Sequence, residues 1–436
     1  MRKLKKIFKS LFDFICGKRE ITFYFQTVRF SDALLALWYS FAELIGLPLA
    51  KNGREEFLRE VNKTFDFQGA YLFGSARSGL YSLLKALAFE DGAEVIVTGF
   101  TCDVVPNAVI QAGCRPVYAD IDQETFCMSS LSAAQCITEK TRAIIIQHTF
   151  GIPADIDALM KLADEHSLYV IEDCAVSLGS RYKGQLTGTF GDAAIFSFEL
   201  SKTITSCRGG LLLINTNKCQ GKTRCEKFYQ SVPEQSRRYA GNILFQFGLS
   251  GLLYRPIIYN VGKYVAAIMF KTGIFKISTP YPEKEAKIAD NYLIKLSNQQ
   301  AALLSRQWKR LKQIKKRSQD ACNYFYGNLK NIPSIISFLV RKDMSLNLIR
   351  YPLIVKNRED LLEVFRKHNV ELGLWFTAPI SSPRTNHKVF GYVSGTCPEA
   401  EKVSAKICNL PIHYKIKISD MDRIISMLSE NARRTD

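Results

Sequence analysis

Two residues that each follow a predicted strand could together hold a carbonyl cofactor. Asp173 follows the apolar run at residues 168–171, and Lys202 lies just past a second apolar run at residues 193–198. Because the ends of two strands can meet in one crevice of a doubly wound sheet, these side chains can converge despite the gap in sequence. A lysine amine can attach pyridoxal 5′-phosphate (PLP) covalently and move a substrate proton, while a carboxylate keeps the pyridine nitrogen protonated. The pattern favours this chemistry, with Lys202 as the attachment point and Asp173 opposite the ring nitrogen.

Two further features could bind the cofactor phosphate. Ser197, shortly before Lys202, is placed to hold it. Residues 73–87, FGSARSGLYSLLKAL, are typical of a strand end, a turn of small residues and a helix. Free amides at a helix N-terminus can cradle a phosphate, although an ordinary N-capped helix explains this stretch equally well when it is taken alone. The stretch matches neither the Rossmann GxGxxG nor the Walker P-loop, which argues against a dinucleotide or a nucleoside triphosphate.

Strand-like and helix-like runs alternate between about residues 69 and 215. This alternation predicts a mostly parallel sheet covered by helices on both faces. We expect strands at residues 94–97, 116–119, 143–147, 168–171, 193–198 and 210–214, and helices at residues 78–89, 104–112 and 156–166. Ligands of such sheets bind beyond the carboxyl ends of the strands, where Asp173 and Lys202 fall.

The later part of the chain departs from this rhythm. An apolar segment at residues 239–275 is interrupted by Arg255, Pro256 and Lys263, so no run reaches the roughly 20 residues of a membrane-spanning helix. A pair of helices, buried or resting on a membrane, fits the segment better. A helical pattern then runs from Ile288 to about Leu329, and the strand and helix patterns at residues 349–355 and 358–368 suggest a small α/β domain. We therefore expect three parts: a helical N-terminal extension (1–65), a large cofactor-binding domain with the 239–275 insertion (66–290), and a long helix with the small C-terminal domain (291–436).

The formal net charge of +18 implies attraction to something anionic. The sequence RQWKRLKQIKKR at residues 306–317 could bind a polyanion, but a solvated basic helix face is the simpler interpretation. Residues 1–18 combine apolar positions at helical spacing with Arg2, Lys3, Lys5, Lys6 and Lys9. This pattern predicts an amphipathic helix that rests either on an anionic membrane or on the protein's own surface.

Composition points to a cytoplasmic protein. Apolar residues make up 47% of the chain and charged residues 23%, as in ordinary globular proteins. The 12 cysteines are scattered, without a CxxC pair or zinc-ligand spacing, which favours reduced thiols. The N-terminus lacks a clear cleavage site for a secretory signal. We expect a cytoplasmic chain that can contact the inner membrane surface through residues 1–18.

Several motifs resemble the DegT/StrS family of PLP-dependent sugar aminotransferases. AEVIVTGFTCDVVPNAVIQAGCRPVYADID (93–122) resembles the family's DEVIVPSFTFVATANAV-GATPVFVDID, and HTFGIPADIDAL (148–159) resembles H-YGxPADMDAI. IEDCAVSLGSRYKGQLTGTFGDAAIFSF (171–198), KLSNQQAALLSRQWKRL (295–311) and CPEAEKVSAKICNLPIHY (397–414) also match its patterns. The resemblance implies fold type I, with a mostly parallel seven-stranded sheet between helices and a small α/β C-terminal domain.

Carried over position by position, the resemblance assigns roles around the cofactor. Lys202 matches the attachment lysine, Asp173 the partner of the pyridine nitrogen, and Ser197 a phosphate ligand. Ala76 and Arg77 fall on a Gly-Thr pair that holds the phosphate. Lys295 stands where the family offers Arg or Asn to the phosphate bound by the neighbouring subunit.

That last assignment implies a homodimer with shared active sites. Three departures from the family pattern suggest an altered pocket. Cys102 occupies the position of an aromatic residue that stacks on the cofactor, Val176 replaces a glutamine near the ring, and Arg208 replaces an acidic residue. A branch of the family replaces the lysine with histidine and performs dehydration; Lys202 argues against that branch.

The resemblance implies transfer of an amino group, with glutamate as donor and a keto-sugar as acceptor, most often a nucleotide-linked one, in the synthesis of surface polysaccharide. One alternative is a non-catalytic protein of this fold that regulates or binds nucleic acid, but no helix-turn-helix or zinc module is recognisable, so we expect no nucleic acid partner. Another possibility is an aminotransferase held at the inner leaflet. Two nearby residues have plainer interpretations: His148 is more often structural than catalytic, and Glu172 points to the opposite sheet face from Asp173.

Overall fold

A seven-stranded sheet forms the centre of the computed structural model, which describes residues 20–435 apart from 24–25, 217, 256–257, 331, 333–334 and 382–384. The strands, in spatial order, are β1 (Gly69–Phe73), β10 (Gly210–Ile214), β9 (Ala193–Ser197), β6 (Tyr169–Asp173), β5 (Thr141–Gln147), β2 (Glu94–Thr98) and β4 (Arg115–Ala119). β9, β6, β5, β2 and β4 run parallel, while β10 is antiparallel to both β1 and β9. The predicted mostly parallel seven-stranded sheet is confirmed.

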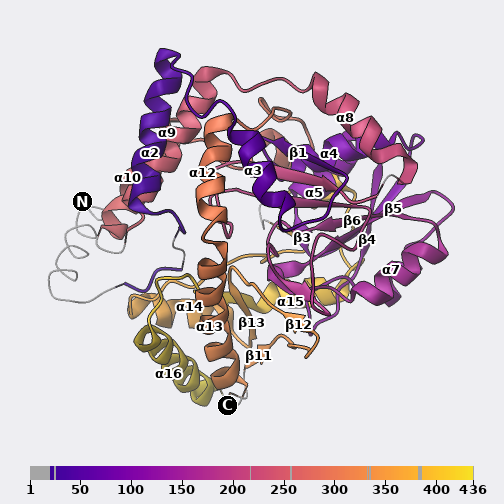
Figure 1. The fold of residues 1–436 in the computed structure, drawn as a ribbon. Helices are drawn as coiled ribbons and strands as arrows, with labels where there is room; N and C mark the ends of the chain where they lie inside the picture. The colour runs from indigo at the N-terminus through magenta and orange to yellow at the C-terminus, as the bar shows by residue number, and fades with distance from the viewer. Residues whose placement is uncertain are drawn as a thin grey trace.

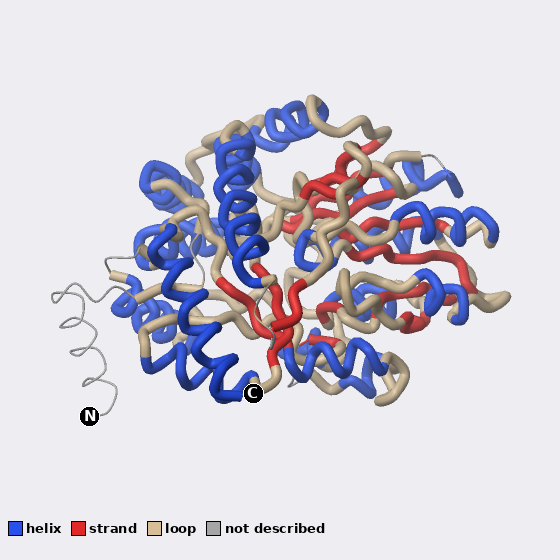
Figure 2. The backbone as a smooth tube through the Cα atoms, turned by 90° about the horizontal axis from the view of Figure 1, so that it is seen from below, coloured by secondary structure: helices blue, strands red, loops and turns tan. Residues whose placement is uncertain are grey.

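Helices lie on both faces of this sheet (Figure 2). They include α4 (Ala76–Leu87), α5 (Val104–Gln111), α6 (Ser130–Gln135), α7 (Ile156–Glu165) and α8 (Gly221–Ser231). Burial on both faces explains why the strands are continuous apolar runs rather than alternating ones; residues of β2, for example, are buried throughout. α4 begins two residues earlier than predicted because the Ser75 side chain accepts the Ser78 N–H and caps the helix there.

A second, three-stranded sheet lies in the C-terminal part of the chain. Its strands β11 (Ile335–Ser337), β13 (Tyr351–Val355) and β15 (Ile407–Leu410) are antiparallel, and α14 (Arg358–Lys367), α15 (Pro398–Lys406) and α16 (Ile418–Thr435) accompany them. A short parallel pair, β3 (Thr101–Cys102) with β14 (Ile380–Ser381), joins this part to a loop of the large sheet. The remaining short elements are β7 (Arg181–Tyr182), β8 (Gln185–Leu186), β12 (Met344–Ser345), α11 (Tyr281–Lys284) and the 3-10 turns Thr149–Gly151, Lys218–Gln220 and His387–Phe390.

The helical pattern predicted from Ile288 to Leu329 is not one helix, and this prediction was wrong. Two helices, α12 (Asn298–Trp308) and α13 (Leu311–Leu329), are separated by a break at Lys309 and Arg310. Residues 288–297 are not helical because their backbone is used elsewhere: the carbonyl of Ile294 accepts the Gly74 N–H at 2.8 Å. Ser297 then caps α12 by accepting the Gln300 N–H.

Three helices lie together at one side of the molecule: α2 (Phe30–Ile45) runs alongside α9 (Arg237–Leu253), and α10 (Tyr259–Lys271) follows α9 (Figure 1). α3 (Gly53–Asn62) packs on α12, and its Phe57 belongs to the core between α12 and the large sheet. The insertion is thus a helix pair, as predicted. None of the described helices is long and apolar enough to cross a bilayer. The predicted amphipathic helix at residues 1–18 lies outside the described residues.

Candidate active site

A cavity of about 380 Å³ lies beyond the carboxyl ends of β6 and β9. Six residues singled out from the sequence line it: Ala76, Arg77, Cys102, Asp173, Ser197 and Lys202, as does Arg208. Two do not: Val176 is buried beside the cavity wall, and Lys295 lies elsewhere. The expected contacts of Val176 and Lys295 with a cofactor stay predictions.

Lys202 occupies a turn just after β9, where its backbone N–H donates to the carbonyl of Glu199 at 3.0 Å. Its Nζ lies 4.7 Å from the centre of the Trp375 ring. Burial lowers the pKa of the Lys202 amine below its ordinary value; Glu199 opposes this shift and Arg350 adds to it. The neutral amine, which is the nucleophilic form, is therefore favoured more than at an exposed lysine.

The loop that follows Lys202 is held by α12. Gln300 donates its side-chain amide to the carbonyls of Ser206 at 3.0 Å and Arg208 at 3.1 Å. Two helical turns further along α12, Gln307 donates its side-chain amide to the carbonyl of Thr205 at 2.6 Å. Both glutamines are buried. α12 therefore fixes the backbone between Lys202 and the start of β10.

Asp173 is the last residue of β6 and is buried. The Ala175 N–H donates to its Oδ1 at 2.9 Å. Burial raises the pKa of the Asp173 carboxyl above its ordinary value, against the opposing effects of that N–H, of Lys202 and of His148. A carboxylate in this position lacks hydration and is stabilised by a facing cation, so a protonated ring nitrogen fits it.

The N-terminus of α4 forms the opposite wall of the cavity. The backbone amides at a helix N-terminus suit a phosphate. Ser75 and Ala76 both line the cavity. A Cβ at Gly210 would lie 2.2 Å from the backbone N of Ala76, so β10 can pass this helix end only because residue 210 is glycine. With Ser197 beside it, this wall is suited to an anion.

Arg77 and Arg208 border this wall but already have partners. The Nε of Arg77 lies 2.6 Å from Oε2 of Glu283, and its Nη2 donates to the carbonyl of Ser278 at 2.8 Å. Arg208 donates to the carbonyl of Ile277. Burial raises the pKa of Glu283 from 4.5 to about 7, although Arg77 opposes the shift. The two arginines thus hold residues 277–283 against the cavity, and Ser278 and Thr279 line it.

Cys102 is a neutral thiol at the cavity wall. Burial, with a further contribution from Asp103, raises its pKa to about 12. Its Sγ donates to Oδ1 of Asp103 at 3.5 Å. A thiol offers no aromatic face for stacking, and the predicted place of Cys102 beside the cofactor ring stays a prediction. Lys295 lies apart, with its amine 3.7 Å from Glu234 and 5.1 Å from the centre of the Tyr229 ring.

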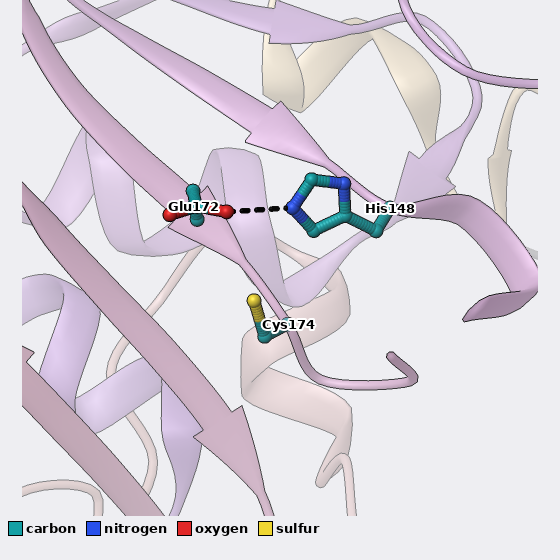
Figure 3. Close-up of side chains that lie close together, drawn as sticks. All are labelled: His148, Glu172 and Cys174. Atoms are coloured by element: carbon teal, nitrogen blue, oxygen red, sulfur yellow. Dashed lines mark hydrogen bonds and ion pairs between the residues drawn. The ribbon is translucent and has the colours of Figure 1, made fainter. Parts of the chain in front are cut away.

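His148, Glu172 and Cys174 lie close together, in a spacing that could suit a metal ion (Figure 3). The hydrogen bonds favour a structural network instead. Glu172 accepts the backbone N–H groups of Gly188 at 2.7 Å, Phe190 at 2.7 Å and Gly191 at 2.9 Å, and its Oε2 lies 2.9 Å from Nε2 of His148.

The other two members of the group are also committed to the protein. Nδ1 of His148 accepts the Ala154 N–H at 3.2 Å, which leaves Nε2 to donate to the Glu172 carboxylate. Burial raises the pKa of the Cys174 thiol well above its ordinary value, so it stays protonated. The carboxylate is saturated by donors, and the group anchors the end of β6 on the face opposite Asp173, as the structural interpretation of His148 and Glu172 expects.

Several residues that line the cavity were not predicted from the sequence. Arg350 and Trp375 come from the C-terminal part of the chain, and the Arg350 guanidinium stacks over the Trp375 ring. Glu199 and Ser201 line the cavity as well. Arg350 could have been found from the sequence, because it is a lone charged residue at the edge of the apolar run at residues 348–355. Charged residues are rarely buried unless they have a partner or a function.

The basic run at residues 306–317 is largely engaged within the protein. Arg306 and Arg310 both pair with the buried Asp32 of α2. Lys315 donates to the carbonyl of Gly179, and Arg317 donates to that of Tyr414. Cations already bonded to the chain are poor candidates for a polyanion site.

The sequence and fold have clear relatives. Residues 51–429 match the DegT/DnrJ/EryC1/StrS aminotransferase family. The spore coat polysaccharide biosynthesis protein SpsC of Bacillus subtilis is 24% identical over 389 residues, which cover 88% of this chain and 90% of SpsC. GDP-perosamine synthase of Escherichia coli O157:H7 is 44% identical over 136 residues, which cover 31% of this chain and 37% of that protein.

The fold is similar to that of a putative sugar aminotransferase, Spr1654 from Streptococcus pneumoniae, in its PLP form. The TM-score is 0.72 at 19% identity, with 95% of this chain and 99% of that chain covered. Lys202 and Asp173, the two residues that the chemistry requires, face one cavity of this fold. The chain belongs to the DegT/DnrJ/EryC1/StrS family and is an aminotransferase of the PLP-dependent class.

Proposed function

We propose that this protein binds PLP at Lys202 and transfers an amino group from glutamate to a nucleotide-linked keto-sugar. The observation that carries the proposal is that Lys202, Asp173 and the N-terminal wall of α4 line a single cavity. When bound, PLP supplies an electron sink and carries the amino group between donor and acceptor. Everything else that the reaction needs must come from the side chains around it.

Each side chain has a role that follows from its chemistry. Lys202 attaches the cofactor and, once released, holds and returns the substrate Cα proton at Nζ. Asp173 keeps the ring nitrogen protonated, while Ser197 and the amide of Ala76 bind the phosphate. Arg350, whose guanidinium lies over the Trp375 ring, lines the cavity and suits a carboxylate of glutamate.

The nature of the acceptor rests on two kinds of support. The similarity to GDP-perosamine synthase, a protein named for a GDP-linked sugar, favours a nucleotide-linked substrate, and the similarity to SpsC favours a role in polysaccharide synthesis. The formal net charge of +18 is also compatible with a diphosphate-linked substrate. The regulatory or nucleic-acid-binding alternative has no comparable support.

The proposal also includes a homodimer in which Lys295 of one subunit reaches the phosphate bound by the other, and contact of residues 1–18 with an anionic membrane. Deleting residues 1–18 and measuring co-sedimentation with vesicles tests the second part. Unchanged co-sedimentation of the truncated protein would rule that segment out as the membrane contact.

A spectroscopic experiment tests the central claim. We expect the purified protein, reconstituted with PLP, to show the visible absorbance band of lysine-bound cofactor, and this band to fall on addition of glutamate. Lys202→Ala should abolish the band. Adding GDP- or other nucleotide-linked keto-sugars to the glutamate-treated protein should restore it for the true acceptor. Absence of any band in the wild-type protein with excess PLP would contradict the proposal.

A further inference from the structure

One side of α2 exposes a row of large apolar side chains. Phe30, Leu34, Trp38, Phe41 and Ile45 recur every three or four residues, so they lie on one helix face. Each is between 47% and 60% exposed. Leu44 and Leu47 extend the row at 65% and 41% exposure. A contiguous apolar row of this size on a surface helix marks an interaction site. We call these seven residues the α2 face.

The α2 face is not needed to attach α2 to the rest of the protein. The opposite side of the helix packs along α9, where a Cβ at Gly248 would lie 2.8 Å from the carbonyl of Ala33. Asp32, on that side, pairs with Arg306 and Arg310 of the C-terminal half. Close packing and a buried ion pair already fix the helix, so the α2 face is free to serve another surface.

Basic side chains flank both ends of this face. At its start, the guanidinium of Arg255 lies 5.2 Å from the centre of the Phe30 ring. At its end, a Cβ on the capping residue Gly46 would lie 2.6 Å from Nη1 of Arg237, so this arginine sits against the end of α2. Apolar rows between cations are typical of surfaces that meet anionic lipid.

A cavity of about 610 Å³ continues the basic character beside Leu44. Arg238 and Lys276 line it together with Leu44, Phe245 and Ile274. Residues 237–276, which form α9, α10 and their flanks, contain no Asp or Glu and six basic residues: Arg237, Arg238, Arg255, Lys263, Lys271 and Lys276. Exposed Ile268 and Ile274 add apolar surface to this region.

The charges favour lipid over a second copy of the chain. Two copies joined through the α2 face would bring the basic residues of both chains together, of which Lys263 is paired with Glu20 and Glu371. Each chain also carries a formal net charge of +18. An anionic bilayer surface neutralises the same cations. Trp38 and Phe41 are stacked with their ring centres 5.9 Å apart, and aromatic side chains of this kind suit the boundary between lipid headgroups and acyl chains.

We propose that the α2 face and the basic α9–α10 helices dock this protein on an anionic lipid bilayer.

Co-sedimentation of the full-length, PLP-loaded protein tests this docking. We expect binding to phosphatidylcholine vesicles that contain phosphatidylglycerol and far weaker binding to phosphatidylcholine alone. The variant Leu34→Ser/Trp38→Ser/Phe41→Ser should bind at least about tenfold more weakly, because it removes apolar area that leaves water on docking. A matched control, Leu131→Ser/Ile336→Ser/Val393→Ser, removes three apolar side chains elsewhere that are more exposed than those of the test variant, and it should bind as the wild type.

Fluorescence gives an independent measurement that needs no multiple variant. Trp38 is 49% exposed, whereas Trp308 is buried and Trp375 lies at the active-site cavity. Brominated anionic lipids should quench wild-type fluorescence, and Trp38→Phe should remove most of that quenching. Wild-type binding by the α2 triple variant would overturn the proposal, whatever residues 1–18 contribute to binding. A shift of the triple variant from dimer to monomer in light scattering would assign the face to a second copy instead.

Discussion

At the scale of single residues, burial acts on the two central ionisable groups in opposite directions. It raises the pKa of the Asp173 carboxyl and lowers that of the Lys202 amine. Both shifts favour the neutral form, so the protein alone does not stabilise an ion pair at the cavity floor. A bound ring cation would give Asp173 its missing counter-charge, and a neutral Lys202 is ready to attack the cofactor carbonyl.

Asp173→Asn should separate catalysis from stability. We expect kcat to fall at least about 100-fold, because an amide does not hold a proton on the ring nitrogen. The cofactor-free variant should be as stable as the wild type or more so at neutral pH, because the substitution removes a buried charge whose raised pKa marks it as costly. Steady-state kinetics and thermal unfolding of the apoprotein measure the two effects. A variant that loses activity only because it unfolds would contradict this assignment.

Glu283 should make stability depend on pH. Its pKa in the folded protein is about 7 against an ordinary 4.5, so between these values the folded state binds more protons than the unfolded state. Its contribution to stability is therefore complete below pH 4.5 and is lost as the pH rises toward 7, by at most about 1.4 kcal/mol per pH unit. Denaturant unfolding of Glu283→Gln should show a flatter pH profile over this window. Equal slopes in the variant and the wild type would refute the idea.

The sequence could predict some cavity residues and not others for a physical reason. Asp173, Ser197 and Lys202 each lie at or just after a strand of one parallel sheet, and the ends of such strands meet at one edge. Arg350 and Trp375 reach the cavity only through the packing of the C-terminal part, which no local pattern encodes. For Arg77, residue type alone could not reveal that Glu283 already holds its guanidinium.

At the scale of elements, α12 acts as the support of the loop after Lys202. Residues 203–209 form no regular ladder of their own, and their carbonyls find donors in the side chains of Gln300 and Gln307. Tertiary contacts also explain why no helix begins at residue 288, as the sequence predicted. The carbonyl of Ile294 accepts the Gly74 N–H, and α12 begins only after this contact, where Ser297 caps it. Helical periodicity indicates which residues share one helix face, but it does not show where tertiary hydrogen bonds prevent the backbone from forming a helix.

Gln300→Ala should loosen this loop. The change removes the side-chain donor of the Ser206 carbonyl, while the Arg208 carbonyl keeps the Ser206 hydroxyl as a donor, and we expect a cost of about 1–3 kcal/mol of unfolding free energy. Because the loop follows Lys202 directly, we also expect weaker PLP binding, measured by titration of the visible band. Gln313→Ala, on an exposed position of α13, is the matched control and should change neither quantity. An unchanged affinity for PLP in Gln300→Ala would show that the loop does not depend on α12.

At the scale of the whole molecule, the mostly parallel large sheet and the C-terminal part with its antiparallel sheet contribute to one cavity. The parallel sheet supplies Lys202 and Asp173, and the C-terminal part supplies Arg350 and Trp375. The alternation of strands and helices allowed the first sheet to be predicted almost strand by strand. Lys295 remains outside the cavity of its own chain, close to Glu234 instead, which agrees with a role in the site of a neighbouring subunit.

Mixed dimers test that role. Lys202→Ala and Lys295→Ala should each be inactive or nearly so as homodimers. If sites are shared, a heterodimer of the two contains one site with both lysines, so an equimolar, re-equilibrated mixture should recover about a quarter of wild-type activity. Recovery requires exchange of subunits, which can be followed by mass photometry of differently tagged chains. No recovery in a mixture with proven exchange would confine Lys295 to its own subunit.

The short pair of β3 and β14 has a consequence for motion. The Thr101 N–H donates to the carbonyl of Pro379 at 2.9 Å, the Asp103 N–H donates to that of Ser381 at 3.1 Å, and the Thr385 hydroxyl donates to Asp103 at 3.0 Å. These bonds tie the C-terminal part to the two residues on either side of Cys102. Movement of that part relative to the large sheet is therefore restrained at the cavity wall itself, close to Trp375, which lies five residues before β14.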